Sequence, residues 1–130
     1  MNYFFDNSKC LSELEGKNLQ ESKFDSHLVQ TCLKLYQMPL NLFDVEDLRI
    51  MIGQNIGLLY LIPIAIERLE MNPLSQGDYY AGDLLEVVLK SQPEFWRQNP
   101  VLKKKIEDIV LNTINDLQSK LQRFENLTCS

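Results

Sequence analysis

The sequence predicts an all-α protein: a single irregular bundle of five or six helices with a long C-terminal helix. Apolar residues recur at three- and four-residue spacing along most of the chain, as on one face of a helix. Alternating apolar and β-branched segments bounded by turns do not recur. Glycine and proline interrupt the helical segments at irregular intervals, which favours an irregular bundle over a regular four-helix one. We expect one domain over residues 1–130, since 130 residues with 45% hydrophobic content suit a single core.

The first third of the chain predicts an arm, a short turn and one helix. Residues 1–9 read as a loosely held arm, and a short turn follows before Gly16, a residue typical of helix ends. Residues 17–25 are polar and predict a loop. Ser26 is a favourable N-cap, and Pro39 ends the helix because the residue before a proline avoids helical geometry. The apolar face of this helix comprises Leu28, Val29, Cys32, Leu33, Leu35 and Tyr36.

The middle of the chain predicts two helices separated by a glycine-rich break. Asp44 is the next N-cap, with Asp47 three residues later in a near-capping-box arrangement. A very apolar helix follows over residues 58–71, and its composition predicts that it is the central helix of the core. Pro63 lies inside this range, so the helix either starts near Ile62 or is kinked at the proline.

The last third predicts three helices. A turn-rich segment precedes a helix over residues 81–91, and Pro93 suits the first turn of a short helix that carries Phe95 and Trp96. Pro100 starts the longest helix, over residues 100–124. Pairs of opposite charges four residues apart indicate its solvent-exposed face. Its apolar stripe comprises Leu102, Ile106, Ile109, Thr113, Leu117, Leu121 and Phe124.

The residues that usually carry chemistry are sparse, so we expect no catalytic residues, metal or cofactor. His27 is the single histidine, and it lies five residues before Cys32, off the three-or-four spacing of one helical face. A Cys–His pair formed by folding stays an alternative; the more ordinary reading is an exposed histidine and a core cysteine. No metal-ligand spacing and no phosphate-binding glycine loop occurs. An enzyme would have to depend on carboxylates alone.

Charge and hydropathy narrow the partners and the compartment. A net charge of −5 is repelled by nucleic-acid phosphates and by anionic membrane surfaces, which leaves a basic protein as the electrostatic complement. The longest apolar run is shorter than the roughly 20 residues that a membrane span needs. The first residues lack the basic and apolar regions of a secretory signal. Three widely spaced cysteines fit free thiols in a reducing cytoplasm.

The acidity is concentrated between Glu67 and Glu94, where six acids stand against two bases. Tyr79 and Tyr80 lie in the middle of this segment, and tyrosine is favoured at interface centres because it buries area and keeps a polar tip. An acidic rim around paired aromatics suits a protein that binds a basic site. We expect one of the two tyrosines to pack between helices.

A set of sequence blocks carries a family resemblance. VEDLR, GQN and GL, at 45–58, are followed in order by GDYY and GDLL, at 77–85. Further blocks lie at 11–16, 24–29, 64–69 and 72–74. Together they resemble the immunity proteins of bacterial contact-dependent growth inhibition (CDI) systems, from about Leu11 to Phe95. Leu59 and Ala81 stand where many members have proline. The blocks do not extend over the long C-terminal helix.

The resemblance implies a non-enzymatic cytoplasmic protein that binds the C-terminal toxin domain delivered by a neighbouring cell. Such toxins are often nucleases, whose basic surfaces would match an acidic face. The resemblance and the charge together give an expected interface: Glu67, Glu70, Asp78, Tyr79, Asp83 and Glu86, with Glu46 and Asp47 as a second patch. Gly53, Gly57 and Gly82 are interpreted as fold determinants. The alternative is a helical adaptor or regulatory subunit that binds another basic protein, and the oligomeric state stays open.

Overall fold

The computed structural model describes residues 2–20 and 26–129, and over these residues the protein is helical without strands. The all-α prediction is therefore confirmed. The described residues form seven α-helices rather than five or six, because the short turn before Gly16 is a helix in its own right. Residues 21–25 of the expected loop lie outside the described part. The helices are α1 (Leu11–Glu15), α2 (His27–Tyr36), α3 (Val45–Gly53), α4 (Leu58–Met71), α5 (Asp83–Leu89), α6 (Pro93–Gln98) and α7 (Pro100–Thr128), with a 3-10 helix, η1 (Leu40–Leu42), before α3.

Local sequence signals fix several of the helix ends. The Ser26 hydroxyl accepts a hydrogen bond from the Val29 amide at 3.2 Å, as an N-cap does. Asp44 and Asp47 form a reciprocal capping box at the start of α3, with bonds of 2.8 and 3.0 Å. The expected helix over residues 81–91 is shorter than predicted, because Ala81 pairs with Gln76 in an isolated bridge and α5 begins only at Asp83.

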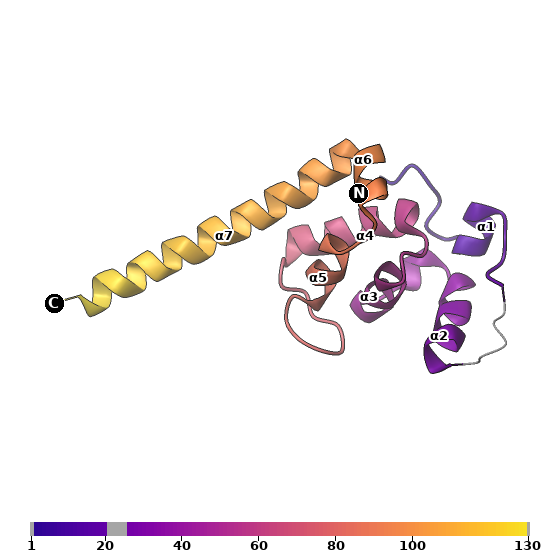
Figure 1. The fold of residues 1–130 in the computed structure, drawn as a ribbon, viewed down its shortest axis with the longest axis horizontal. Coiled ribbons are helices and arrows are strands. Elements are labelled where there is room, and N and C mark those ends of the chain that lie inside the picture. The colour runs from indigo at the N-terminus through magenta and orange to yellow at the C-terminus, as the bar shows by residue number, and fades with distance from the viewer. Residues whose placement is uncertain (1, 21–25, 130) are drawn as a thin grey trace.

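Helix α4 is the central element, as its composition predicts. It begins at Leu58 and runs through Pro63, so the alternative start near Ile62 is wrong. Helices α3, α5 and α7 each pack against it, and α2 packs on the other side of α3 (Figure 1). Half of its residues are buried and belong to one apolar cluster: Leu58, Leu61, Ile62, Ile64, Ala65, Ile66 and Leu69.

The N-terminal arm differs from the loosely held segment that the sequence suggested. Tyr3 and Phe5 pack against the apolar cluster, with their rings stacked at a centroid distance of 5.0 Å. The Tyr3 hydroxyl donates a hydrogen bond to Glu67 on α4. The backbone of Asn41 donates to the carbonyl of Asn7 at 2.8 Å. The hydrogen-bond partners of the arm lie more than 30 positions away in the sequence, so no local pattern in the arm could predict these bonds.

Helix α7 leaves the body of the molecule after its first few turns and projects away from it (Figure 1). Its 29 residues span about 43 Å at 1.5 Å per residue. Of the expected apolar stripe, Ile106 and Ile109 are buried, whereas Leu117, Leu121 and Phe124 are exposed. The core therefore covers only the first part of the stripe. No helix in the described ranges combines the length and hydropathy needed to cross a membrane.

Candidate protein-binding face

The loop between α4 and α5 is folded around the carboxylate of Asp83. This carboxylate accepts hydrogen bonds from the backbone amides of Gly77 at 2.7 Å and Tyr79 at 3.1 Å. The residue is only 3% exposed. A buried carboxylate needs such donors to offset its lost hydration. Asp83, predicted as an interface residue, instead holds the loop in shape and is not available to a partner.

A second set of bonds joins this loop to the first turns of α3. Glu46 accepts hydrogen bonds from Arg49 Nε at 2.6 Å and Nη2 at 2.5 Å, and its Oε1 accepts another from the Asp78 amide at 2.9 Å. Arg49 also lies 3.9 Å from Asp83 Oδ2. The bonds from Arg49 lower the pKa of Glu46, and the bonds to Glu46 raise the pKa of Arg49. Gly77 packs directly against Glu46, where a β-carbon would collide with the carboxylate.

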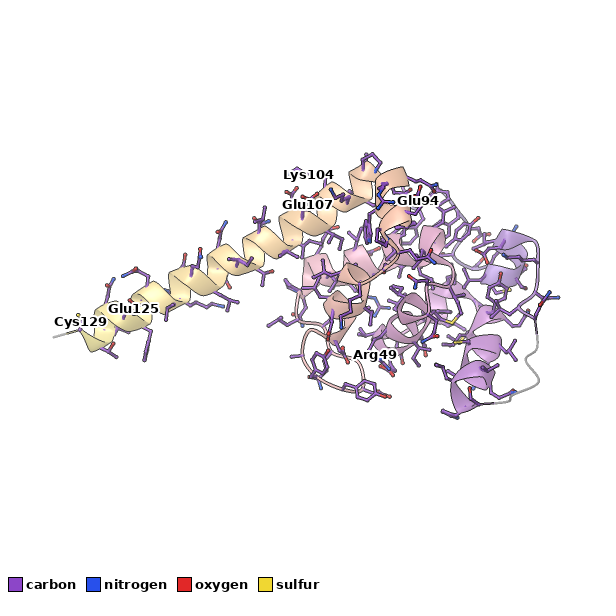
Figure 2. The ribbon with its side chains drawn as sticks, viewed as in Figure 1. Arg49, Glu94, Lys104, Glu107, Glu125 and Cys129 are labelled. Carbon is purple, nitrogen blue, oxygen red and sulfur yellow. The ribbon has the colours of Figure 1, made fainter. Side chains whose placement is uncertain are left out.

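The exposed surface above these bonds is acidic and carries an aromatic ring. Tyr79 is 71% exposed, and Arg49 Cζ lies 4.5 Å from the centroid of its ring, a cation–π geometry. Asp78 beside it is exposed. Figure 2 shows Arg49 on this side of the body, well away from the projecting end of α7. We call this surface the acidic face and define it as Asp44, Glu46, Asp47, Asp78 and Tyr79.

Two carboxyl groups of the acidic face have pKa values above the usual one. Partial desolvation, and next the charge of Glu46, raise the pKa of Asp78. Burial raises the pKa of Asp47, and the neighbouring Asp44 carboxylate adds to the rise. Because a nearby cation would stabilise both carboxylates, the acidic face favours a positively charged group brought by a partner.

The structure regroups the residues that the sequence proposed for the interface. Glu46 and Asp47, expected as a second patch, lie with Asp78 and Tyr79 on one face. Glu86, on α5, is paired with Lys90 at 2.7 Å. Tyr79 and Tyr80 are 71% and 50% exposed, so the expectation that one of the two packs between helices is wrong.

The two remaining predicted interface residues lie on other features of the molecule. Glu67 accepts the hydrogen bond from Tyr3, and Glu70 lines a groove beside α7. Sequence reasoning missed Arg49, although its position three residues after Glu46 in a helix was a usable signal.

That groove lies between the end of α4, the following loop and α7, with a volume of about 690 Å³. Its walls mix apolar residues, Leu69, Leu74 and Ile109, with charges of both signs from α7. A smaller groove of about 420 Å³ lies where α5, α6 and α7 meet and contains Trp96. Both grooves are lined by charges of both signs, so neither has the single-sign lining that would select a charged small molecule.

The candidate catalytic pair is not assembled for nucleophilic chemistry. His27 is exposed at the start of α2, and Cys32 is buried in the core. Burial raises the pKa of the Cys32 thiol, which disfavours the thiolate that attacks substrates. Within residues 2–20 and 26–129, no group of three or more His, Cys, Asp or Glu side chains could hold a metal ion.

Comparison with known proteins identifies the family of the chain. No curated protein and no solved structure matches the chain. A family model described as CDI immunity proteins matches residues 13–106. The match contains α2 to α6 and the acidic face, and it ends within the second turn of α7. It spans well over half of the chain, so the chain belongs to the family of CDI immunity proteins.

Proposed function

We propose that this protein neutralises the C-terminal toxin domain of a cognate CDI effector in the cytoplasm, and that the toxin docks on the acidic face. Family membership supports the neutralising role. The docking surface is supported by one observation above all: Glu46 and Asp83 hold the Arg49 guanidinium beneath an exposed Tyr79. Asp44, Asp47 and Asp78 add negative charge beside Glu46. We further propose that the toxin surface is basic and belongs to a nuclease, since nucleases hold phosphates with lysine and arginine.

The chemistry of the acidic face fits such a partner. Tyr79 offers a large, stiff ring at low entropic cost, and the bond network beneath it keeps the ring in place before binding. A lysine or arginine near Asp78 would gain charge pairing while relieving the repulsion from Glu46. An acidic surface also accelerates encounter with a basic protein, in a way that added salt screens.

Co-expression of this chain with the toxin domain of its cognate CDI effector tests the neutralising role. We expect the wild-type chain to co-purify with the toxin and to restore growth of cells that make it. If it does neither, the proposed function is wrong.

The docking surface needs its own variants. Tyr79→Ala and Asp78→Lys should each weaken toxin binding at least tenfold, with circular dichroism spectra unchanged because both side chains are exposed. Glu94→Lys is the matched control, since Glu94 is an exposed acid on α6 that pairs with Arg97. It should leave affinity within about twofold, as an exposed pair contributes little. If Tyr79→Ala and Asp78→Lys bind the toxin with the affinity of the wild type, as the control does, the acidic face is excluded as the docking surface. The neutralising role would stay intact.

A further inference from the structure

The projecting half of α7 carries an apolar stripe that the body of the protein does not cover. We define the α7 stripe as Val110, Ile114, Leu117, Leu121 and Phe124. These residues follow one another at intervals of four and three positions, the heptad spacing of a coiled-coil seam. Those from Ile114 onward are between 44% and 61% exposed. Singly exposed apolar residues are ordinary, but a continuous stripe on a free helix indicates a contact surface.

We propose that the α7 stripe pairs with the same stripe of a second copy of this chain, in a short parallel two-stranded coiled coil over residues 110–128. The occupant is inferred from the charges beside the stripe. With Ile114 and Leu121 at the a positions, Leu117 and Phe124 take the d positions, Lys120 is at g and Glu125 at e. In the first of these two a/d layers, Ile114 at a with Leu117 at d is the combination that favours two strands.

The charges select the parallel orientation. In a parallel pair, a g residue faces the e residue five positions later in the other helix, so Lys120 meets Glu125 of the partner subunit twice by symmetry. In the antiparallel pair that centres the same stripe, Lys120 would face the partner's Lys120. Both side chains are exposed, and Lys120 is bonded to Asp116 of its own helix at 2.9 Å. Lys120 and Leu117 also line the outer end of the groove beside α7.

The body leaves room for this arrangement. Ile109 marks the side of α7 that packs on the core, and successive residues turn by 100° around the helix. The stripe residues therefore lie between about 60° and 140° around the helix from Ile109, and about 100° on average. A twofold axis along the seam then puts the two bodies on opposite sides. Figure 2 shows Glu125 and Cys129 at the end of α7 that is farthest from the body.

The pairing length implies a weak dimer. Residues 110–128 span about 28 Å, fewer than three heptads. We therefore expect dissociation in the micromolar range, so that the full chain is dimeric only when concentrated. This pairing uses a surface outside the family match and apart from the acidic face, so its failure would leave the proposed function untouched.

Sedimentation equilibrium of the full chain tests the pairing. The wild type should form a dimer, and Leu121→Glu should raise its dissociation constant at least tenfold. The fold should be unaffected, because Leu121 is exposed on the free part of the helix. Ser119→Glu on the solvent-exposed face is the matched control and should change the constant less than threefold. A wild type that stays monomeric at several hundred micromolar, or a Leu121→Glu variant that dimerises like the wild type, would overturn the proposal.

The orientation has two separate tests. Cys129 is exposed whereas Cys10 and Cys32 are buried, so a short bismaleimide should link two Cys129 thiols in a parallel dimer. The antiparallel pair would hold them about 30 Å apart, beyond its reach. Glu125→Lys and Lys120→Glu should each weaken self-association, and mixing the two variants should restore it as a heterodimer. Failure of cross-linking in a protein shown to be dimeric, or a Glu125→Lys dimer of wild-type affinity, would exclude the parallel pair. Protection of the stripe only in a one-to-one toxin complex would assign it to the toxin instead.

Discussion

Glu46 holds Arg49 by two hydrogen bonds, of 2.6 and 2.5 Å, while its Oε1 also accepts the amide of Asp78 from a loop 32 residues away. One carboxylate therefore orders both the cation beneath Tyr79 and the backbone that presents the ring. Binding surface and loop fold depend on the same side chain.

Glu46→Gln should destabilise the protein by about 2 kcal/mol at neutral pH, because Arg49 keeps its partial burial but loses its charge partner. The pKa of Glu46 is lowered in the fold, so this stabilisation is present above pH 4.5 and disappears as pH falls through the lowered value. Urea unfolding of the wild type and of Glu46→Gln, from neutral pH down to pH 2, measures this stabilisation. A difference that stays constant down to pH 2 would contradict the ion-pair explanation.

Asp83→Asn should destabilise the protein by about 2 kcal/mol, because the amide group has one acceptor oxygen where the carboxylate uses two, Oδ1 for the Gly77 amide and Oδ2 for the Tyr79 and Tyr80 amides. The change also leaves Arg49 with one carboxylate fewer. Asp78→Asn is the control in the same loop. Its carboxyl is exposed and repelled by Glu46, so this change should leave stability unaltered or slightly raised. Thermal unfolding of the two variants distinguishes them; equal melting temperatures would show that Asp83 does not organise the loop.

Gly57→Ala should destabilise the protein far more than Gly16→Ala. Both glycines have left-handed backbone, with φ of 65° and 70°, so each alanine costs about 1 kcal/mol in conformation. A β-carbon at Gly16 meets open space, whereas one at Gly57 would lie 2.7 Å from Leu11 Cδ1. Overpacking there should add about 1–3 kcal/mol. Chemical denaturation measures the loss in free energy of unfolding for each variant. Equal losses would mean that α1 shifts to accommodate the new β-carbon without an energetic cost.

Tyr3→Phe tests whether the arm is bound to α4. Burial and the hydrogen bond to Glu67 raise the pKa of Tyr3 to about 12. The stabilisation from this phenol is therefore fully present below pH 10 and lost as pH rises from 10 to 12. The stability difference between wild type and Tyr3→Phe should be constant below pH 10 and vanish across that interval. Absence of any difference at pH 8 would show that the hydrogen bond does not hold the arm.

Residues close together in the sequence made most of the secondary structure predictable. The caps at Ser26 and Asp44, and the proline that starts α7, act through hydrogen bonds and dihedral preferences within a few residues. The apolar character of residues 58–71 likewise identified the central helix without reference to its neighbours. The acidic composition that pointed to a basic partner is also a property of the sequence alone.

What the sequence determined about this protein is thus its helical class, most helix limits, its charge and its family blocks. The tertiary structure decided which acids share a surface. Glu46 joins Asp78, Asp83 is buried beneath them and Glu67 is bonded to Tyr3, through contacts between residues 32 to 64 positions apart. It also decided that the apolar stripe of α7 remains uncovered. Periodicity shows that a helix has an apolar face, but only packing shows whether the same chain covers it.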